Sequence, residues 1–292
     1  MPDLASISKA IDFVEENLRE PVTVAAMATS AGYSLYYFCR VFNQVTHHTP
    51  YDYLIRRRLS ESARTLLDTE QKIIDIALNY QFSGPETFSR AFRRMFDTQP
   101  SQMRKAGFVD GHRLMPRLTL AYLEHIQGRM ATKPELVEWE PARLAGLMTL
   151  VRDVQADRDR LWSLLDRELG LLACDVRFRS FYGMAHFPPG WQSDGFPYLA
   201  AVRIEDAGLE ATSLVYKTLP RLNLAKFGHC GGWTALPLSL DYIFHTWLPK
   251  TRTRPSHPWV IEDYGPELPA AGSLESPIGI GIPVQQEQQR WL

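Results

Sequence analysis

Two arginines stand 50 residues apart in the same local setting. Arg40 lies in Phe38-Cys-Arg-Val-Phe42, and Arg90 lies in Phe88-Ser-Arg-Ala-Phe92. The guanidinium of arginine is a planar fork of donors that can bind O6 and N7 of one guanine together. On a single helix, two arginines would most simply belong to a solvated face. Because the setting is repeated, we expect Arg40 and Arg90 to read bases of double-stranded DNA.

Other side chains on the same helix faces can extend this interface. The further candidates for DNA contact are Leu35, Tyr36, Cys39, Pro85, Glu86, Thr87 and Arg94. Glu86 can accept a hydrogen bond from N4 of cytosine, and Tyr36 and Thr87 can contact thymine methyl groups or phosphates. Arg57 and Arg93 are candidates for phosphate contact. Arg57 is the middle of a run of three arginines, which either contacts phosphate or only solvates its helix.

These residues are positioned by two copies of one supersecondary unit. The segment 24–34 matches 73–83 at an offset of 49, and the segment 38–50 matches 88–100 at an offset of 50. Each copy has the pattern of a short helix, a turn, and a longer helix with its phenylalanines inward. This pattern predicts two helix-turn-helix units.

The surrounding sequence completes a helical domain. Pro50 opens a long amphipathic helix between the two copies, and residues 7–18 form one more. We predict an all-α domain over residues 1–107, a linker over 108–132, and an α+β domain over 133–292. In the last domain, a strand and helix pattern recurs after about 79 residues, which predicts duplicated strand-helix-strand units.

Aromatic residues are dense in the C-terminal half. They are Trp191, Phe196, Tyr198, Phe227, Trp233, Tyr242, Phe244, Trp247, Trp259 and Tyr264. Glu262 lies between the last two, and a carboxylate among aromatic faces can bind a lipophilic cation by charge pairing and cation–π contact. The alternative is that the aromatic residues form core and Glu262 lies on the surface. We name Glu262, Tyr198, Trp233 and Tyr264 as candidate ligand-binding residues.

The sequence contains no convincing catalytic constellation. GxSxG, HExxH, the P-loop and GxGxxG are absent, and the glycine-rich Gly228-His-Cys-Gly-Gly-Trp233 lacks the lysine of a phosphate site. His47 and His48 have no further ligand at metal-binding spacing. We therefore expect no enzyme activity, no cofactor and no metal site.

The N-terminal motifs resemble the AraC/XylS family of bacterial transcription regulators. The resemblance covers residues 5–106 and rests on the segments 31–34, 38–42, 49–59, 76–82, 87–96 and 99–100. It implies a homeodomain-like pair of helix-turn-helix units that read successive major-groove segments. Gln81 departs from the glycine usual in the family, and Glu86 departs from a frequent glutamine.

The C-terminal motifs are similar to those of the GyrI-like effector-binding domain. They are Phe196-Pro-Tyr198, Gly231-Gly-Trp233, Thr246-Trp-Leu-Pro249, Ile261-Glu-Asp-Tyr264 and the segment 278–283. The resemblance implies a ligand cleft between duplicated halves and a functional glutamate at Glu262, although Asp263 replaces a residue that is often basic. The order of the two domains resembles Rob-type regulators, which implies monomeric DNA binding and activation of promoters.

Composition and charge set the remaining expectations. Of 292 residues, 45% are hydrophobic and 22% charged, which excludes a disordered or collagenous chain. The whole chain has a net charge of −1, but residues 40–105 are basic, with 11 basic and 7 acidic groups. Cys39, Cys174 and Cys230 form no disulfide pattern, and no signal peptide is evident, so we expect a cytoplasmic, nucleoid-associated protein.

The expected partners are double-stranded DNA, RNA polymerase and a small amphipathic or cationic effector, without a membrane. The favoured function is a transcription regulator, most simply an activator. The alternative keeps DNA binding but lets the C-terminal domain sequester or hydrolyse a reactive drug-like compound, with Glu262 polarising water.

Overall fold

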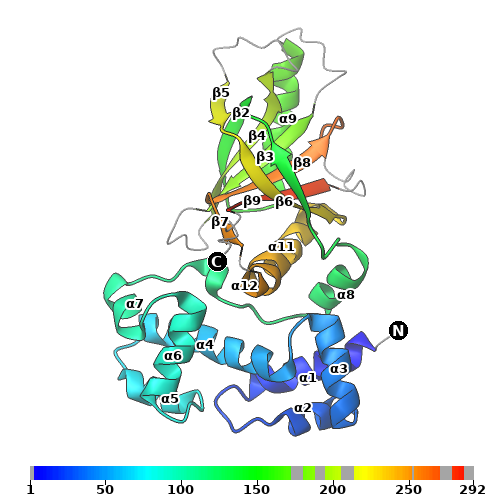
Figure 1. Ribbon diagram of the computed structural model, residues 1–292. Coiled ribbons are helices and arrows are strands. Elements are labelled where there is room, and N and C mark those ends of the chain that lie inside the picture. Colours follow the sequence, from blue (N-terminus) through cyan, green and yellow to red (C-terminus); the bar gives the residue numbers. More distant parts are fainter. Residues whose placement is uncertain are drawn as a thin grey trace, which may run out of the picture. The chain divides into compact units, whose positions relative to one another are not determined.

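The computed structural model describes residues 3–171, 180–187, 195–204, 214–251, 253–269 and 278–285. Cys174 and Trp191 lie outside the described residues. The chain divides into two compact units (Figure 1). The first unit comprises Met1–Gln127 with Asp241–Pro249, and the second comprises Gly128–Leu240 with Lys250–Leu292.

The first unit is helical, as the repeated 3.6-residue pattern predicts. Its elements are α1 (Leu4–Glu16), α2 (Val24–Ser30), α3 (Leu35–Thr46), α4 (Pro50–Asp68), α5 (Ile73–Asn79), α6 (Pro85–Phe96), α7 (Pro100–Ala106), η1 (Gly111–Arg113) and α8 (Leu120–Gly128). The two helix-turn-helix units are α2 with α3 and α5 with α6.

The recognition helices α3 and α6 are held by matching aromatic pairs. Phe38 and Phe42 of α3 have ring centroids 5.3 Å apart, and Phe88 and Phe92 of α6 repeat this spacing at 5.3 Å. All four side chains are fully buried. The expected inward face is therefore confirmed, and the opposite face of each helix is left toward solvent.

The turn between the paired helices needs a left-handed residue in both units. In the first unit this residue is Gly32, with φ of 72°. In the second unit it is Gln81, with φ of 63°, at the position where the sequence departs from glycine. The Gln81 side chain donates from Nε2 to the carbonyl oxygen of Arg19 at 2.6 Å.

A short helical segment from the C-terminal half belongs to the first unit. The helix α11 (Gly232–Tyr242) continues through the π-helical turn η3 (Ile243–Trp247) into α12 (Leu248–Lys250). Thr246 is buried there, and its hydroxyl lies 2.9 Å from Nε2 of His48 and 3.4 Å from the hydroxyl of Tyr122. The segment is thus part of the interior of the helical unit.

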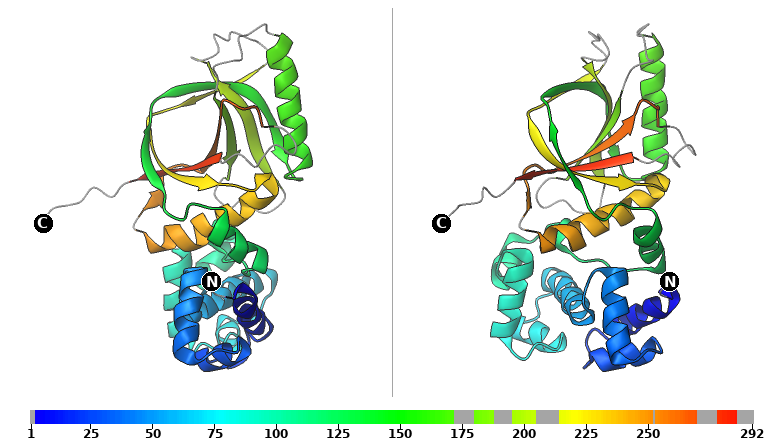
Figure 2. Two further views of the ribbon diagram at one scale, coloured as in Figure 1. Left: turned by 90° about the vertical axis from the view of Figure 1, so that its right-hand side faces the viewer. Right: turned by 45° about the vertical axis from the view of Figure 1, so that its right-hand side comes forward.

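The second unit is built on one antiparallel sheet. Its strands are β1 (Glu135–Trp139), β2 (Ala142–Val151), β3 (Phe181–His186), β4 (Phe196–Arg203), β5 (Val215–Leu219), β6 (Leu222–His229), β7 (Arg254–Pro255), β8 (Trp259–Gly265) and β9 (Ile278–Gln285). The sheet is strongly curled, and α9 (Ala156–Leu171) lies alongside it, against β2 and β4 (Figure 2).

The strand order shows the internal duplication. It is β1-β6-β9-β8-β3-β4-β2-β5, with β7 paired to β9 off this path. Exchanging β1 with β5, β2 with β6, β3 with β8 and β4 with β9 gives the same order read from the other end. The two halves, β1-β2-α9-β3-β4 and β5-β6-α11-β8-β9, are therefore related by a pseudo-twofold axis between β3 and β8.

Alternate residues of β8 serve the two faces of the sheet. Ile261 packs into an apolar cluster that includes Leu144, Met184 and Leu224. Because side chains alternate along a strand, Glu262 points to the opposite face. There it meets Arg158 from α9.

Candidate nucleic-acid interface and buried carboxylate site

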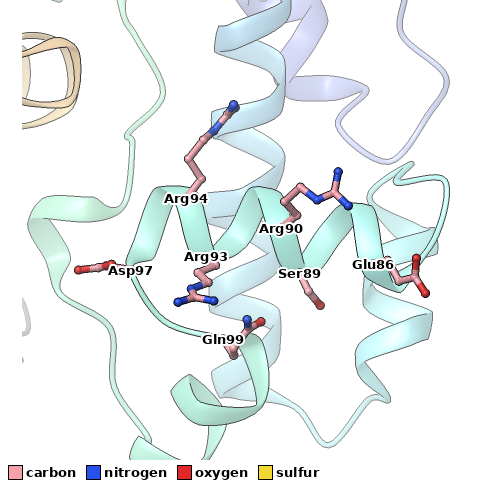
Figure 3. A pocket seen from close by; sticks show the side chains of 7 residues that line it. All are labelled: Glu86, Ser89, Arg90, Arg93, Arg94, Asp97 and Gln99. Carbon is pink, nitrogen blue, oxygen red and sulfur yellow. The ribbon is translucent and has the colours of Figure 1, made fainter.

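The outward face of α6 carries a cluster of cations. Glu86, Ser89, Arg90, Arg93, Arg94, Asp97 and Gln99 line an open hollow of about 550 Å³ (Figure 3). Arg90 and Arg94 extend to one side of the helix, while Ser89 and Arg93 extend to the other (Figure 3). Three arginines outnumber two carboxylates, so the surface has the sign that a phosphate backbone attracts.

The predicted contact residues of α6 are accessible. Pro85, Glu86, Thr87, Arg90 and Arg94 are all exposed, as is Arg93, the candidate for phosphate contact. The helix begins with proline at its first turn, which suits a position without an intrahelical N–H partner. The Thr87 hydroxyl donates to the carbonyl oxygen of Gly84 at 3.1 Å, which fixes the start of the helix.

The outward face of α3 is equally accessible but less charged. Leu35 and Tyr36 are 50% and 83% exposed, Arg40 is exposed, and Cys39 is half-buried. The guanidinium of Arg40 lies 5.4 Å from the ring centroid of Tyr37. This cation–π contact restricts the orientation of the arginine side chain. The sequence analysis did not identify Tyr37 as a neighbour of Arg40.

Arg57 is buried, whereas a phosphate contact requires a side chain on the surface. Its side chain is 5% exposed and makes two hydrogen bonds to Glu15, from Nε at 2.8 Å and from Nη2 at 2.7 Å. Nη2 also bonds Glu61 at 2.9 Å, and Nη1 donates to the carbonyl oxygen of Met115 at 2.7 Å. The expectation that Arg57 contacts phosphate is therefore wrong, because α4 turns this side chain into the domain interior.

The other two arginines of the run are also engaged. Arg56 binds Asp52 from Nε at 2.9 Å, and Arg58 donates to the carbonyl oxygens of Leu18 and Glu20 at 2.9 and 2.6 Å. The run therefore joins α4 to α1 and to the start of α4 itself. The three consecutive arginines therefore make ion pairs and hydrogen bonds within the helical unit.

Comparison with known proteins identifies the family of the helical unit. A helix-turn-helix domain family matches residues 27–106. The regulatory protein SoxS of Escherichia coli strain K12 is 41% identical over 98 residues, which cover 34% of this chain and 92% of SoxS. The chain belongs to the AraC/XylS family of transcription regulators. This AraC/XylS member is thus a DNA-binding transcription regulator.

Longer relatives of this AraC/XylS regulator match over part of their length. The transcriptional regulator Rob of Salmonella typhimurium is 35% identical over 120 residues, which cover 41% of this chain and 42% of Rob. A solved AraC-type transcriptional regulator from Chromobacterium violaceum is 27% identical, with a TM-score of 0.34, and the match covers 35% of this chain and 92% of that one.

Within the described residues, no helix is long and apolar enough to cross a membrane. The same residues contain no group of three or more His, Cys, Asp or Glu side chains that could hold a metal ion. His48 instead bonds Asp52 at 2.8 Å from Nδ1.

In the second unit, the four predicted ligand residues come together around Glu262. The Oε2 atom accepts hydrogen bonds from the hydroxyls of Tyr198 and Tyr264, each at 2.6 Å. Trp233 donates from Nε1 to the Tyr264 hydroxyl at 2.9 Å. Glu262 and Tyr198 are fully buried, so the alternative that Glu262 lies on the surface is wrong.

Arg158 is the group that sequence reasoning missed. It is 2% exposed, and its Nη1 lies 2.9 Å from Oε2 of Glu262. Its guanidinium carbon lies 4.2 Å from the centre of the Tyr198 ring and 5.7 Å from that of Phe196. A signal was present in the sequence, because Arg158 lies on the apolar stripe of α9. The buried residues of this stripe are Arg158, Leu161, Trp162, Leu165 and Leu169.

The two tyrosine hydroxyls beside Glu262 stay protonated and donate hydrogen bonds to it. Burial and the adjacent carboxylate raise the pKa of Tyr198 and that of Tyr264 well above the usual range. Both hydroxyls therefore keep their protons at neutral pH and donate to Oε2. The charge of Glu262 is thus surrounded by fixed donors.

Glycine opposite Glu262 makes room for this arrangement. Gly183 of β3 is the direct cross-strand partner of Glu262. A Cβ atom at Gly183 would lie 2.0 Å from the Tyr198 hydroxyl and 2.5 Å from Oε2 of Glu262. Across the pseudo-twofold axis, one half supplies the carboxylate and the other supplies the space for it.

Within the part of the chain that the structure describes, three buried polar atoms of this site have no hydrogen-bond partner. They are Oε1 of Glu262, Nε of Arg158 and Nε1 of Trp162. Buried polar groups are normally paired, and those left unpaired in a native structure call for an explanation. The site therefore has unused donors and an unused acceptor within a charged, aromatic interior.

Proposed function

We propose that this regulator reads two successive major-groove segments through α3 and α6 and that a small amphipathic cation bound in its second unit controls it. The observation that carries the DNA-reading part is the exposure of Arg40 and Arg90 at equivalent positions of two helices. A helix-turn-helix reads DNA with the face of its second helix that the core does not use.

The proposed base-reading residues on α3 are Leu35, Tyr36, Cys39 and Arg40. Those on α6 are Pro85, Glu86, Thr87, Arg90 and Arg94, while Arg93 contacts phosphate. Both sets lie on one chain, so a monomer presents two recognition helices to one face of the duplex. We further propose that the protein acts in the cytoplasm, on the nucleoid, as an activator that contacts RNA polymerase.

Selection from a random pool of duplexes tests this proposal. The full-length protein is incubated at two salt concentrations, and bound duplexes are sequenced. Two short motifs in fixed order, about 10 base pairs apart, are expected, because the recognition helices enter successive major-groove segments. A single motif, or enrichment that disappears at the higher salt, would contradict two-headed reading. Sedimentation of the complex should give one protein per duplex.

The effector proposal rests on the chemistry around Glu262. A carboxylate lined by Tyr198 and Tyr264, with Trp233 behind them, offers negative charge and aromatic faces to an organic cation. The duplicated sheet supports the proposal that this unit is GyrI-like.

Calorimetry with tetraphenylphosphonium tests the effector proposal. This aromatic cation has no hydrogen-bond donor, and triphenylphosphine oxide is its uncharged counterpart. The cation is expected to bind more tightly than the oxide, and Glu262→Gln is expected to remove the difference. Equal binding of both compounds would contradict a charge-reading site.

The drug-hydrolysing alternative has less support. Hydrolysis would need a water molecule at Glu262 in addition to the bound compound, and Glu262 and Tyr198 are fully buried. We expect a bound compound to be recovered unchanged after incubation, which chromatography measures. Turnover that is lost in Glu262→Gln would instead favour the alternative.

A further inference from the structure

We propose that Arg158 is a tethered cation that occupies the effector position at Glu262 and that an effector must displace it. This inference rests on the proposed effector function. It concerns how the site is kept closed, and it assigns Arg158 a role in setting affinity and selectivity.

Arg158 makes the contacts expected of a bound organic cation. Its guanidinium pairs with Glu262 at 2.9 Å and lies over the face of Tyr198 at 4.2 Å. Phe196 supplies a second aromatic ring at 5.7 Å. Charge pairing together with aromatic faces is the recognition chemistry of a cation cage, here filled by the protein itself.

Arg57 and Glu15 form a second buried arginine–glutamate pair in the described part of the chain. Arg57 and Glu15 form two parallel bonds, at 2.8 and 2.7 Å, and the remaining Arg57 nitrogen, Nη1, bonds Met115. A bidentate arginine–carboxylate pair in which every guanidinium nitrogen has a partner is typical of a structural ion pair. That pair leaves no atom for a ligand.

The Arg158 pair is different in each of these respects. Among the described residues, Arg158 reaches Glu262 through a single bond from Nη1, and its Nε has no partner. The three donors to Glu262 in these segments converge on Oε2, while Oε1 has none there. A buried ion pair with poor geometry recovers little of its desolvation cost. Such a pair can be exchanged for another cation at modest cost.

Arg158 can leave Glu262 without unfolding its helix. The helix α9 is anchored to the sheet by Leu161, Trp162, Leu165 and Leu169, all buried. The arginine side chain has several rotatable bonds, so it can swing out while the apolar stripe stays in place. Displacement then frees the Tyr198 face and Oε2 for a ligand.

The inference has a consequence for selectivity. A ligand must outcompete a guanidinium that is covalently held at the site, so small hydrophilic cations should bind poorly. A large aromatic cation gains from apolar surface that Arg158 does not use, and the unpaired Nε1 of Trp162 offers a donor to a polar substituent. The tethered arginine therefore selects for lipophilic cations.

Calorimetry on matched variants tests the inference. Arg158→Met removes the tethered cation, and Arg160→Met makes the same change at an exposed position two residues along α9. Arg158→Met is expected to bind tetraphenylphosphonium at least 10-fold more tightly than the wild type, with triphenylphosphine oxide changed less than 2-fold. Arg160→Met should match the wild type.

The outcomes separate the two proposals. If wild type binds the cation through Glu262 but Arg158→Met binds it no more tightly, the tethered-cation inference is wrong and the effector function stands. If neither protein binds the cation in preference to the oxide, the effector function fails and the inference fails with it.

A measurement on the wild type covers the case in which Arg158→Met does not fold. Arginine Nε–H signals are followed by nitrogen-15 NMR, with Arg158 assigned from the signal missing in Arg158→Lys. Saturating tetraphenylphosphonium should move the Arg158 signal from a protected to a rapidly exchanging state. A protected, unshifted signal in the saturated complex would overturn the inference.

Discussion

The two helix-turn-helix units share an interior but not a surface. Phe38 and Phe42 are matched by Phe88 and Phe92 at the same ring spacing, and both recognition helices end in a left-handed residue with φ of 59°. The outer faces differ, because α3 presents Arg40 beside uncharged residues while α6 presents three arginines and Glu86 (Figure 3). Packing sets the frame, and the solvent-facing residues set what each unit can read.

The junctions that follow the two recognition helices differ as well. After α3, His48 bonds Asp52, and Asp52 also pairs with Arg56 at the start of α4. After α6, Gln99 and Gln102 form an uncharged capping box at the start of α7. The contacts at the junction after α3 therefore depend on the ionisation of Asp52, whereas those at the junction after α6 involve no ionisable group.

The largest expected effect concerns the two reading arginines. Arg40→Ala and Arg90→Ala should each weaken binding of the selected duplex by about 1 to 3 kcal/mol and relax base preference in one motif only. Fluorescence anisotropy against a panel of single-base variants measures both effects, with the exposed Arg160→Ala as control. Uniform weakening across all duplexes would make the arginine a phosphate contact instead.

The next effect concerns the turns. A side chain in the left-handed region is strained, so Gly32→Gln should lower the free energy of unfolding by about 1 to 2 kcal/mol, although no atom lies within 4 Å of the added Cβ.

The reciprocal change, Gln81→Gly, relieves that strain but removes the bond from Gln81 to Arg19. We expect a gain of less than about 1 kcal/mol. Urea unfolding of the two variants beside wild type measures the asymmetry, and equal losses in both would show that the turns have the same conformational requirement.

A smaller effect is the pH dependence of the stability that Asp52 contributes at the junction after α3. Burial opposes ionisation of Asp52, but the hydrogen bond from His48 and the charge of Arg56 outweigh it and lower the pKa of Asp52 to about 2. A carboxyl group with a lowered pKa stabilises the fold above its ordinary pKa, and this contribution is lost as the pH falls from about 4 to about 2.

The Asp52 side chain is 36% exposed, so solvent screening reduces the contribution to about 1 kcal/mol. The difference in unfolding free energy between wild type and Asp52→Asn should therefore shrink by that amount between pH 5 and pH 2. Parallel curves for the two proteins would mean that the ion pair at this junction contributes nothing. Gln99→Ala, at the uncharged junction, serves as the pH-independent control.

The smallest effect concerns Glu86. Glu86→Gln removes a negative charge from the exposed start of α6, so binding of duplex DNA should strengthen by about 0.5 kcal/mol at low salt and by less at high salt. Base preference should change only in the motif that α6 reads. A loss of affinity would instead identify Glu86 as an acceptor for a cytosine amino group.

The helical unit was predictable because its signals are local. The phenylalanine spacing, the turn residues and the proline that opens α4 each lie within a few residues of the structure they specify. The aromatic and acidic composition near Glu262 likewise indicated which residues gather there. The duplication of the second unit was visible as a faint repeat.

The partners of the buried arginines were not predictable from such signals. Arg57 meets Glu15, 42 positions earlier, and Arg158 meets Glu262, 104 positions later. Nothing in the sequence near Arg57 distinguishes a guanidinium that faces solvent from one that enters a core. For Arg158 the apolar stripe of α9 was informative, because an arginine on it must have a buried partner.

The helical run from Gly232 to Lys250 contributes side chains to both units. Near its beginning, Trp233 bonds Tyr264 inside the second unit, and further along, Thr246 bonds His48 inside the first. A fragment of this chain that ends at Gln127 would therefore lack Asp241–Pro249, a segment that belongs to the same compact unit as both helix-turn-helix pairs.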